Sequence, residues 1–117
     1  MKVRFQAKEH QMIEEEIFEI EKIVEVIAAY HLSNFYLDVK SISYHLSQIS
    51  KCPNKEYPKI IVYKPEVIVP IELTITDLSD LEYFLSQHPY STYHLEIESR
   101  VFKMQKEGEL KRQLSLR

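Results

Sequence analysis

Five histidines and one cysteine are the side chains of this chain that could bind a transition metal. Structural zinc sites need paired ligands at close spacing. The candidates stand singly in different segments: His10, His31, His45, Cys52, His88 and His94. His88 and His94 flank one loop and could chelate a metal weakly, but solvated loop histidines explain them equally well. We therefore expect no metal site.

Acid–base chemistry would depend on a small set of glutamates. Glu72 is flanked by apolar residues in a strand-like segment, and Glu96 and Glu98 are expected to share one face of a later strand. Catalysis needs such groups in a cleft with shifted pKa values. A hydrolase that uses these three glutamates is our third hypothesis. Cys52 has no base near it in the sequence, so we expect it to be a passive thiol and assign no catalytic residue.

The glycine content restricts the possible functions most strongly. Gly108 is the one glycine of the chain. Loops that bind phosphate and the elbow that presents a nucleophilic serine both need glycine, because the backbone must approach a ligand closely or adopt a positive φ. The sequence contains neither a Walker loop nor a dinucleotide-binding fingerprint. We expect that the chain is not an enzyme and binds no cofactor.

Composition is that of an ordinary globular domain. The 117 residues are 44% hydrophobic and 28% charged, with a net charge of −3, which argues against disorder. A single cysteine excludes an intramolecular disulfide and is typical of a reducing compartment. No apolar run approaches the roughly 18 residues of a membrane span, and no signal peptide is apparent. We expect a cytoplasmic protein without internal repeats.

An apolar stripe predicts a long helix over residues 8–31. Its members recur at spacings of four and three residues: Ile13, Ile17, Ile20, Val24 and Ile27. The stripe would pack in the core of the chain or mediate a helical dimer. A short strand is expected over residues 35–39 and a second helix over residues 40–50, which must end before Pro53.

The second half of the chain has the clearest strand pattern. Residues 59–63 and 67–75 predict a hairpin, and Pro70 places its second strand at a sheet edge or a bulge. A third helix is expected from Leu78 to about His88. Ser79 and Glu82 have capping-box spacing, and Asp77 and Asp80 favour the helix start. Residues 93–101 predict a further strand.

These elements predict an α+β fold with a small antiparallel sheet of three to four strands. A long N-terminal helix and one or two shorter helices would pack on it. We expect one domain over residues 1–103, followed by a charged tail over residues 104–117 that is helical when bound. A chain that ends after Phe102 should then stay folded.

Residues 40–49 (KSISYHLSQI) resemble the recognition helix of winged helix-turn-helix repressors of the ArsR type. The resemblance implies DNA binding, with the hairpin of residues 59–75 in the place of a wing. Bases would be contacted by Ser41, Ser43, Tyr44 and Gln48, and phosphates by Lys40, Lys51 and Lys55. The resemblance covers about ten residues, and residues 34–38, where the family has a scaffold helix, predict a strand. DNA binding is therefore our alternative hypothesis.

Segregated charges and numerous tyrosines favour a protein–protein interaction module. Residues 66–98 hold seven acidic residues and no lysine or arginine, whereas residues 99–117 hold six bases and two acids. Tyrosine is enriched at interfaces. We expect a regulatory or inhibitory module that docks on a partner protein or on itself as a homo-oligomer. The predicted contacts are Glu15, Glu19, Tyr57, Tyr90, Tyr93, Arg100, Lys103, Lys111 and Arg112.

Overall fold

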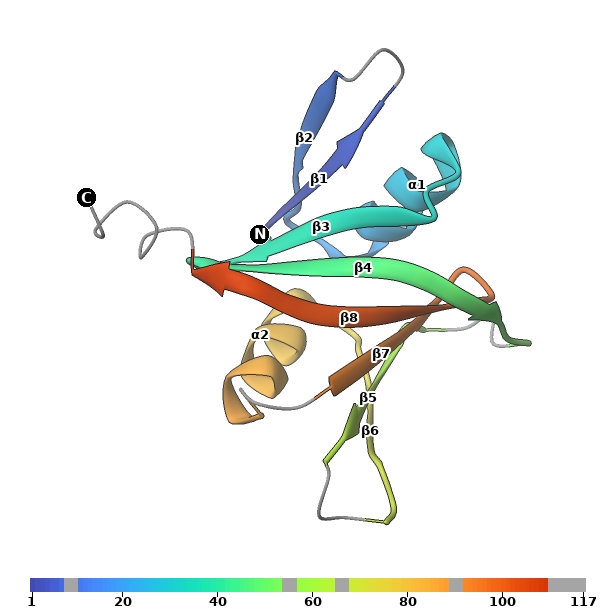
Figure 1. The fold of residues 1–117 in the computed structure, drawn as a ribbon, viewed down its shortest axis with the longest axis vertical. Coiled ribbons are helices and arrows are strands. Elements are labelled where there is room, and N and C mark those ends of the chain that lie inside the picture. Colours follow the sequence, from blue (N-terminus) through green and yellow to red (C-terminus); the bar gives the residue numbers. More distant parts are fainter. Residues whose placement is uncertain (8–10, 54–56, 65–67, 89–91, 110–117) are drawn as a thin grey trace.

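The computed structural model describes residues 1–7, 11–53, 57–64, 68–88 and 92–109. Over these residues the chain forms one antiparallel sheet of eight strands with two helices (Figure 1). The predicted sheet of three to four strands packed by a long N-terminal helix is therefore wrong. Within the described ranges, neither helix is long and apolar enough to cross a membrane.

The elements follow one another as strand, strand, helix, strand and strand, and this series occurs twice. They are β1 (Lys2–Gln6), β2 (Met12–Glu16), α1 (Ile20–Tyr30), β3 (Asn34–Val39), β4 (Ile42–Lys51), β5 (Lys59–Tyr63), β6 (Ile71–Thr74), α2 (Leu78–Gln87), β7 (Thr92–Ile97) and β8 (Arg100–Glu109). Across the sheet the order is β2-β1-β3-β4-β8-β7-β5-β6. The strands β2 and β6 are thus the two edges.

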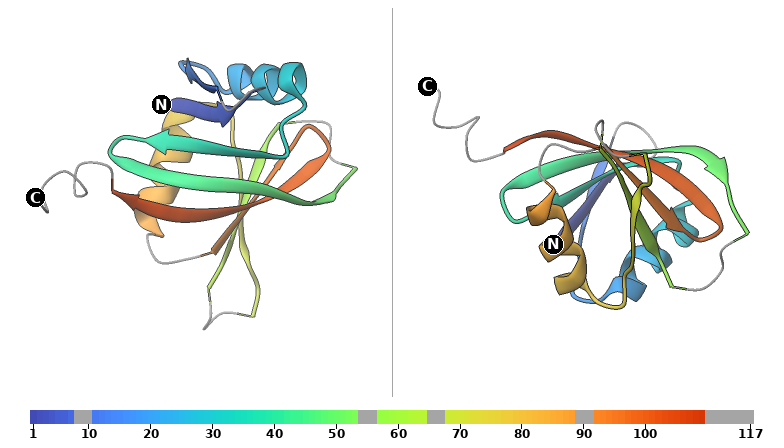
Figure 2. Two further views of the ribbon diagram at one scale, coloured as in Figure 1. Left: turned by 45° about the horizontal axis from the view of Figure 1, so that its top comes forward. Right: turned by 90° about the horizontal axis from the view of Figure 1, so that it is seen from below.

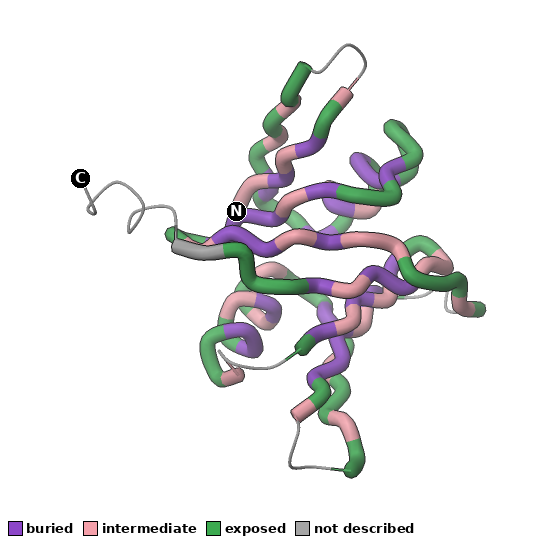
Figure 3. Tube along the Cα trace, viewed as in Figure 1, coloured by how far each residue is buried: buried purple, intermediate pink, exposed green. Residues whose placement is uncertain are grey.

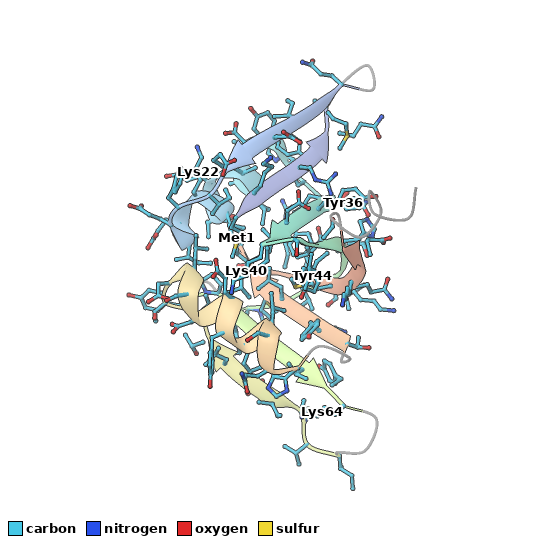
Figure 4. All side chains as sticks on the ribbon, turned by 90° about the vertical axis from the view of Figure 1, so that its left-hand side faces the viewer. Met1, Lys22, Tyr36, Lys40, Tyr44 and Lys64 are labelled. Atoms are coloured by element: carbon cyan, nitrogen blue, oxygen red, sulfur yellow. The ribbon has the colours of Figure 1, made fainter. Side chains whose placement is uncertain are left out.

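The sheet curves around the two helices, which lie on the same side of it (Figure 2). The core fills the space between them and runs along the central strands (Figure 3). We call the other side, which no helix covers, the open face. Figure 4 shows Tyr36 of β3 on the open face and Lys22 of α1 on the helix side.

The predicted N-terminal helix divides into β2 and α1. Ile13 and Ile17 are four residues apart, and a spacing of four keeps two residues on one face of a helix and also on one face of a strand. Pairing with β1 selects the strand, in which Ile13 and Glu15 are half-buried while Glu14 and Glu16 are exposed. The helix begins only at Ile20.

The predicted helix over residues 40–50 is the ten-residue strand β4. Ile42 and Leu46 share a face because they too are four residues apart, and Leu46 is fully buried. Ile49, which completed the helical pattern, lies where the pairing with β8 shifts register and is 51% exposed. The first turn of that predicted helix is instead the β3–β4 hairpin turn, where Lys40 has a φ of 57°.

The predicted domain boundary at residue 103 falls inside β8. This strand reaches Glu109, pairs with both β4 and β7, and buries Met104 completely. Because such a chain would lose Met104 and most of this strand, we expect that a chain ending after Phe102 does not stay folded. Residues 110–117 of the predicted tail lie outside the described residues.

Other predictions are confirmed. Residues 35–39 form most of β3, the hairpin over residues 59–75 forms β5 and the shorter β6, and α2 lies where expected. The single strand predicted over residues 93–101 is wrong, because Glu98 and Ser99, both with positive φ, form the turn that divides it into β7 and the start of β8. The start of α2 is Asp77, whose Oδ1 accepts a hydrogen bond from the backbone N–H of Asp80 at 3.0 Å. The capping residue is thus Asp77 rather than Ser79.

The two halves of the chain are structural repeats, which the sequence analysis missed. Read inward from either edge, the strands follow the same order, and β4 pairs with β8 at the centre. From β2 onward, matching positions are separated by a constant 58 residues, the offset between Ile13 and Ile71. In β1 and β5 the offset is 57, from Lys2 to Lys59. We call positions related in this way equivalent.

Equivalent positions share burial and local conformation. The buried pairs include Ile17 with Ile75, Ile23 with Leu81, Ile27 with Leu85, Phe35 with Tyr93, Leu37 with Leu95, Tyr44 with Phe102 and Leu46 with Met104. Glu19 and Asp77 both start a helix, and Lys40 and Glu98 both have positive φ in a hairpin turn. Each position therefore has an internal counterpart with which it can be compared.

Candidate functional site

The structure separates the residues predicted to contact a partner. Tyr93 is 1% exposed in the core, its hydroxyl donates to the backbone oxygen of His88, and burial raises its pKa to about 12. Its predicted role as a surface contact is wrong. Tyr90, Lys111 and Arg112 lie outside the described residues.

The remaining predicted contacts do not form one surface. Arg100 donates to the backbone oxygen of Leu32 at 2.7 Å, so its guanidinium forms a hydrogen bond between the two repeats. Lys103 lies on the open face of β8 opposite His94. The other three are Glu15 of β2, Glu19 at the start of α1, and Tyr57, which is 60% exposed before β5.

The DNA-binding alternative loses the helix on which it depends, because β4 replaces it. Tyr44 and Ser43 are each 4% exposed, and Ser43 accepts a hydrogen bond from Arg4 at 2.8 Å. Lys40 and Ser41 form the β3–β4 turn, whereas Gln48 and Lys51 lie further along β4. Lys55 is outside the described residues.

The residues considered for catalysis and metal binding are also dispersed. Glu98 is in the β7–β8 turn, and Glu96 and Glu72 are on strands separated by β5. His88 contacts the ring of Phe84, and His94 contacts the ring of Tyr63. Within the described part of the chain no three metal-binding side chains gather.

Two surface hollows of about 510 and 540 Å³ flank α1. The first lies between the β1–β2 hairpin and the helix end, and the second between the helix and Tyr57. Apolar atoms dominate both linings, and each lining includes at most one histidine or carboxylate, His31 in the first and Glu21 in the second. Neither of these two linings brings together a pair of groups for acid–base catalysis, whereas a third hollow of about 280 Å³ at the start of α1 is lined by Glu16, Glu19, Glu21 and Glu25.

The β6 edge combines free backbone with exposed apolar side chains. Ile68 is 99% exposed, Val69 72% and Ile71 36%, and Tyr63 on the neighbouring β5 is 40% exposed. Figure 3 shows this end of the hairpin largely exposed. We call β6 together with Ile68 and Val69 the β6 edge. Pro70 was predicted to lie at an edge, but Ile68, Val69 and Ile71 were not predicted as contacts, although three β-branched residues around Pro70 at an edge are a signal for association.

The backbone of β6 presents donors and acceptors to solvent in a definite pattern. The N–H of Ile75 donates to the oxygen of Pro58 at 2.7 Å, so the backbone of residue 75 points toward β5. Alternation along a strand then directs the N–H and C=O groups of Glu72 and Thr74 away from β5. Pro70 points the same way but has no N–H to donate.

The other edge shows how this fold protects such a position. On β2 the residues equivalent to Leu73 and Thr74 are Glu15 and Glu16, and Glu14 contacts Lys2 at 3.6 Å. Charged side chains on an edge strand oppose pairing with a further strand. The edges lie at opposite ends of the molecule (Figure 1). The β6 edge has one of these charges, at Glu72, beside its apolar residues.

The comparisons identify no relative. No family model, curated protein or solved structure matches the chain. The β6 edge is therefore the candidate site for function.

The open face of β7 supplies a pH-dependent contribution to stability. Burial lowers the pKa of His94, Lys103 lowers it further, and Glu96 opposes the shift. A lowered pKa means that the folded state disfavours charged imidazole, so the contribution is present above the ordinary pKa of 6.5 and is lost as pH falls through the folded-state pKa. His94→Gln should reduce the loss of stability below pH 6.5, as measured by urea unfolding at neutral and acidic pH. An equal loss in both proteins would contradict this assignment.

Proposed function

We propose that the chain is a protein–protein interaction module that docks through the β6 edge by accepting a further β-strand. Main-chain hydrogen bonds supply affinity in this mode of recognition, and side chains on alternate faces supply specificity. The observation that carries the proposal is the difference between two equivalent edges, since β2 exposes Glu14 and Glu16 beside Met12, while the β6 edge exposes Ile68, Val69 and Ile71.

An edge strand that stays unpaired leaves its outward backbone donors and acceptors exposed. An exposed edge with apolar, β-branched side chains is a template for association, and proteins usually block it. Pro70 limits pairing at one end of β6 without blocking Glu72 and Thr74, whose backbone groups stay free for a partner. Such an edge favours association over a short, defined segment.

The test is photo-crosslinking in the cell, with a photoreactive amino acid in place of Val69. The matched control places it at Gln11, the equivalent exposed position before β2. We expect an adduct of higher mass from position 69 and none from position 11. The absence of an adduct at position 69, or equal yields at both, would count against docking at the β6 edge.

A further inference from the structure

We infer that the strand accepted by the β6 edge is β6 of a second copy of this chain, paired antiparallel about a twofold axis at Leu73. This inference rests on the proposed docking at the β6 edge and adds the identity of the partner and the register. Three independent features of β6 select this arrangement: its backbone donors, its side chains and its charges.

The backbone donors select the register. With Leu73 opposite Leu73 of the second copy, Glu72 stands opposite Thr74, and both residues point N–H and C=O groups outward. Each of the two Glu72–Thr74 pairs then exchanges two hydrogen bonds. A register centred on Ile71 would place Glu72 opposite Pro70, which has no N–H, and a register centred on Glu72 would place two carboxylates opposite each other.

On the helix side of the sheet, the two paired β6 strands present apolar side chains to each other. Leu73 pairs with the buried Ile60 of β5 and packs against the core, so it lies on the helix side of the sheet, and Ile71 lies on the same side. The twofold axis brings the two Leu73 side chains opposite each other. Burial of the 36% exposed surface of Ile71 adds apolar contact on either side of them.

The open face of the same pair has complementary charges. Glu72 is opposite Ile61 of β5, so it lies on the open face, as does Thr74 opposite Lys59. In the inferred register Glu72 of the second copy stands beside Thr74, two strands from Lys59. Two strand spacings separate these positions, roughly 9.6 Å, a span that a lysine and a glutamate side chain can bridge together. The twofold axis creates this contact twice.

The alternative pairings are repulsive. Joining β2 of two copies would bring the exposed Glu14 and Glu16 of each against those of the other. Joining the β6 edge of one copy to β2 of the next would place Glu72 beside those same glutamates and would build rings or filaments. Charge therefore favours a closed dimer over a filament.

The experiment is sedimentation velocity of the full chain over a range of concentrations. Because β6 is a four-residue strand, we expect a weak dimer whose fraction rises with concentration. Thr74→Pro removes an outward donor without touching the pairing with β5, and it should weaken dimerisation by roughly tenfold or more. Its matched control is Glu16→Pro at the equivalent position of β2, which should dimerise like the wild type.

The inferred attraction between Glu72 of one copy and Lys59 of the other can be tested separately. Glu72→Lys places a lysine near Lys59 of the other copy and should weaken the dimer, whereas Glu14→Lys at the equivalent position should not. Circular dichroism on each variant checks that the fold is kept. A dimer unaffected by both Thr74→Pro and Glu72→Lys would overturn the register, and a monomer at every concentration would overturn the identity of the partner.

The crosslinking experiment distinguishes this inference from the proposed function. An adduct at position 69 with the mass of two chains supports both. An adduct with a different protein overturns the second copy as occupant and leaves docking at the β6 edge standing. No adduct at all removes both.

Discussion

A chain that ends after Phe102 is expected to lose its cooperative unfolding transition. The deletion removes Met104, which is 0% exposed, and most of the strand that joins β4 to β7. Loss of a buried methionine side chain alone costs about 2–5 kcal/mol, against a net stability of roughly 5–15 kcal/mol for a typical domain. The deletion also leaves β4 and β7 as new unpaired edges.

The matched control for this deletion ends after Glu109 and keeps β8 complete. Urea unfolding followed by circular dichroism should show a cooperative transition in the control and none in the shorter chain. Equal transition midpoints in the two proteins would mean that the centre of the sheet does not depend on β8, contrary to the pairing described above.

The Arg4→Met variant is expected to lose about 3 kcal/mol of stability. Arg4 donates from Nε to Asp38 Oδ2 at 2.6 Å and from Nη2 to Asp38 Oδ1 at 3.0 Å. Asp38 is 7% exposed, and this fork also contacts Ser43. Removing the guanidinium leaves a buried carboxylate without its charged partner, which costs far more than the loss of an exposed ion pair.

Adding Asp38→Asn to Arg4→Met tests whether the unpaired carboxylate of Asp38 causes the loss of stability. If the cost comes from an unpaired charge, the double variant should recover part of the lost stability, because the amide carries no charge to desolvate. The free energies come from urea unfolding at neutral pH. A double variant no more stable than Arg4→Met would show that the unpaired carboxylate is not the cause and would favour lost packing of the arginine.

The equivalent site in the second repeat supports a structural role, rather than a functional one, for the network of Arg4, Asp38 and Ser43. Ile61 and Val101 stand where Arg4 and Ser43 stand in the first repeat, and Glu96 there lies opposite Lys59. The same fold position thus holds a buried ion pair in one repeat and two buried apolar side chains in the other, as expected when such a pair contributes little net stability.

The mistaken helices have a common physical origin. Ile13 and Ile17, and Ile42 and Leu46, are separated by four residues, a distance that suits one face of either a helix or a strand. What decides between them is the partner, which is β1 for the first pair and β3 and β8 for the second. Of these partners, β8 is distant in the sequence, and β1 and β3 are neighbouring strands whose pairing the spacing of the apolar residues does not reveal.

Local patterns by themselves determined the elements whose signals are unambiguous. Strict alternation and Pro70 located β5 and the edge strand β6, and an acidic start followed by an apolar stripe located α2. They also marked most of the residues that form the core. These properties depend on neighbours along the chain, so the sequence carries them directly.

Only the tertiary structure decided which strands pair, that the two halves repeat one arrangement, and which edge stays open. Alternation tells which side chains share a face of a strand, but not which strand lies beside it. The difference between the glutamates of β2 and the apolar residues of the β6 edge became visible once both were seen to end the same sheet. The candidate site is a property of that pairing order, which long-range contacts determine.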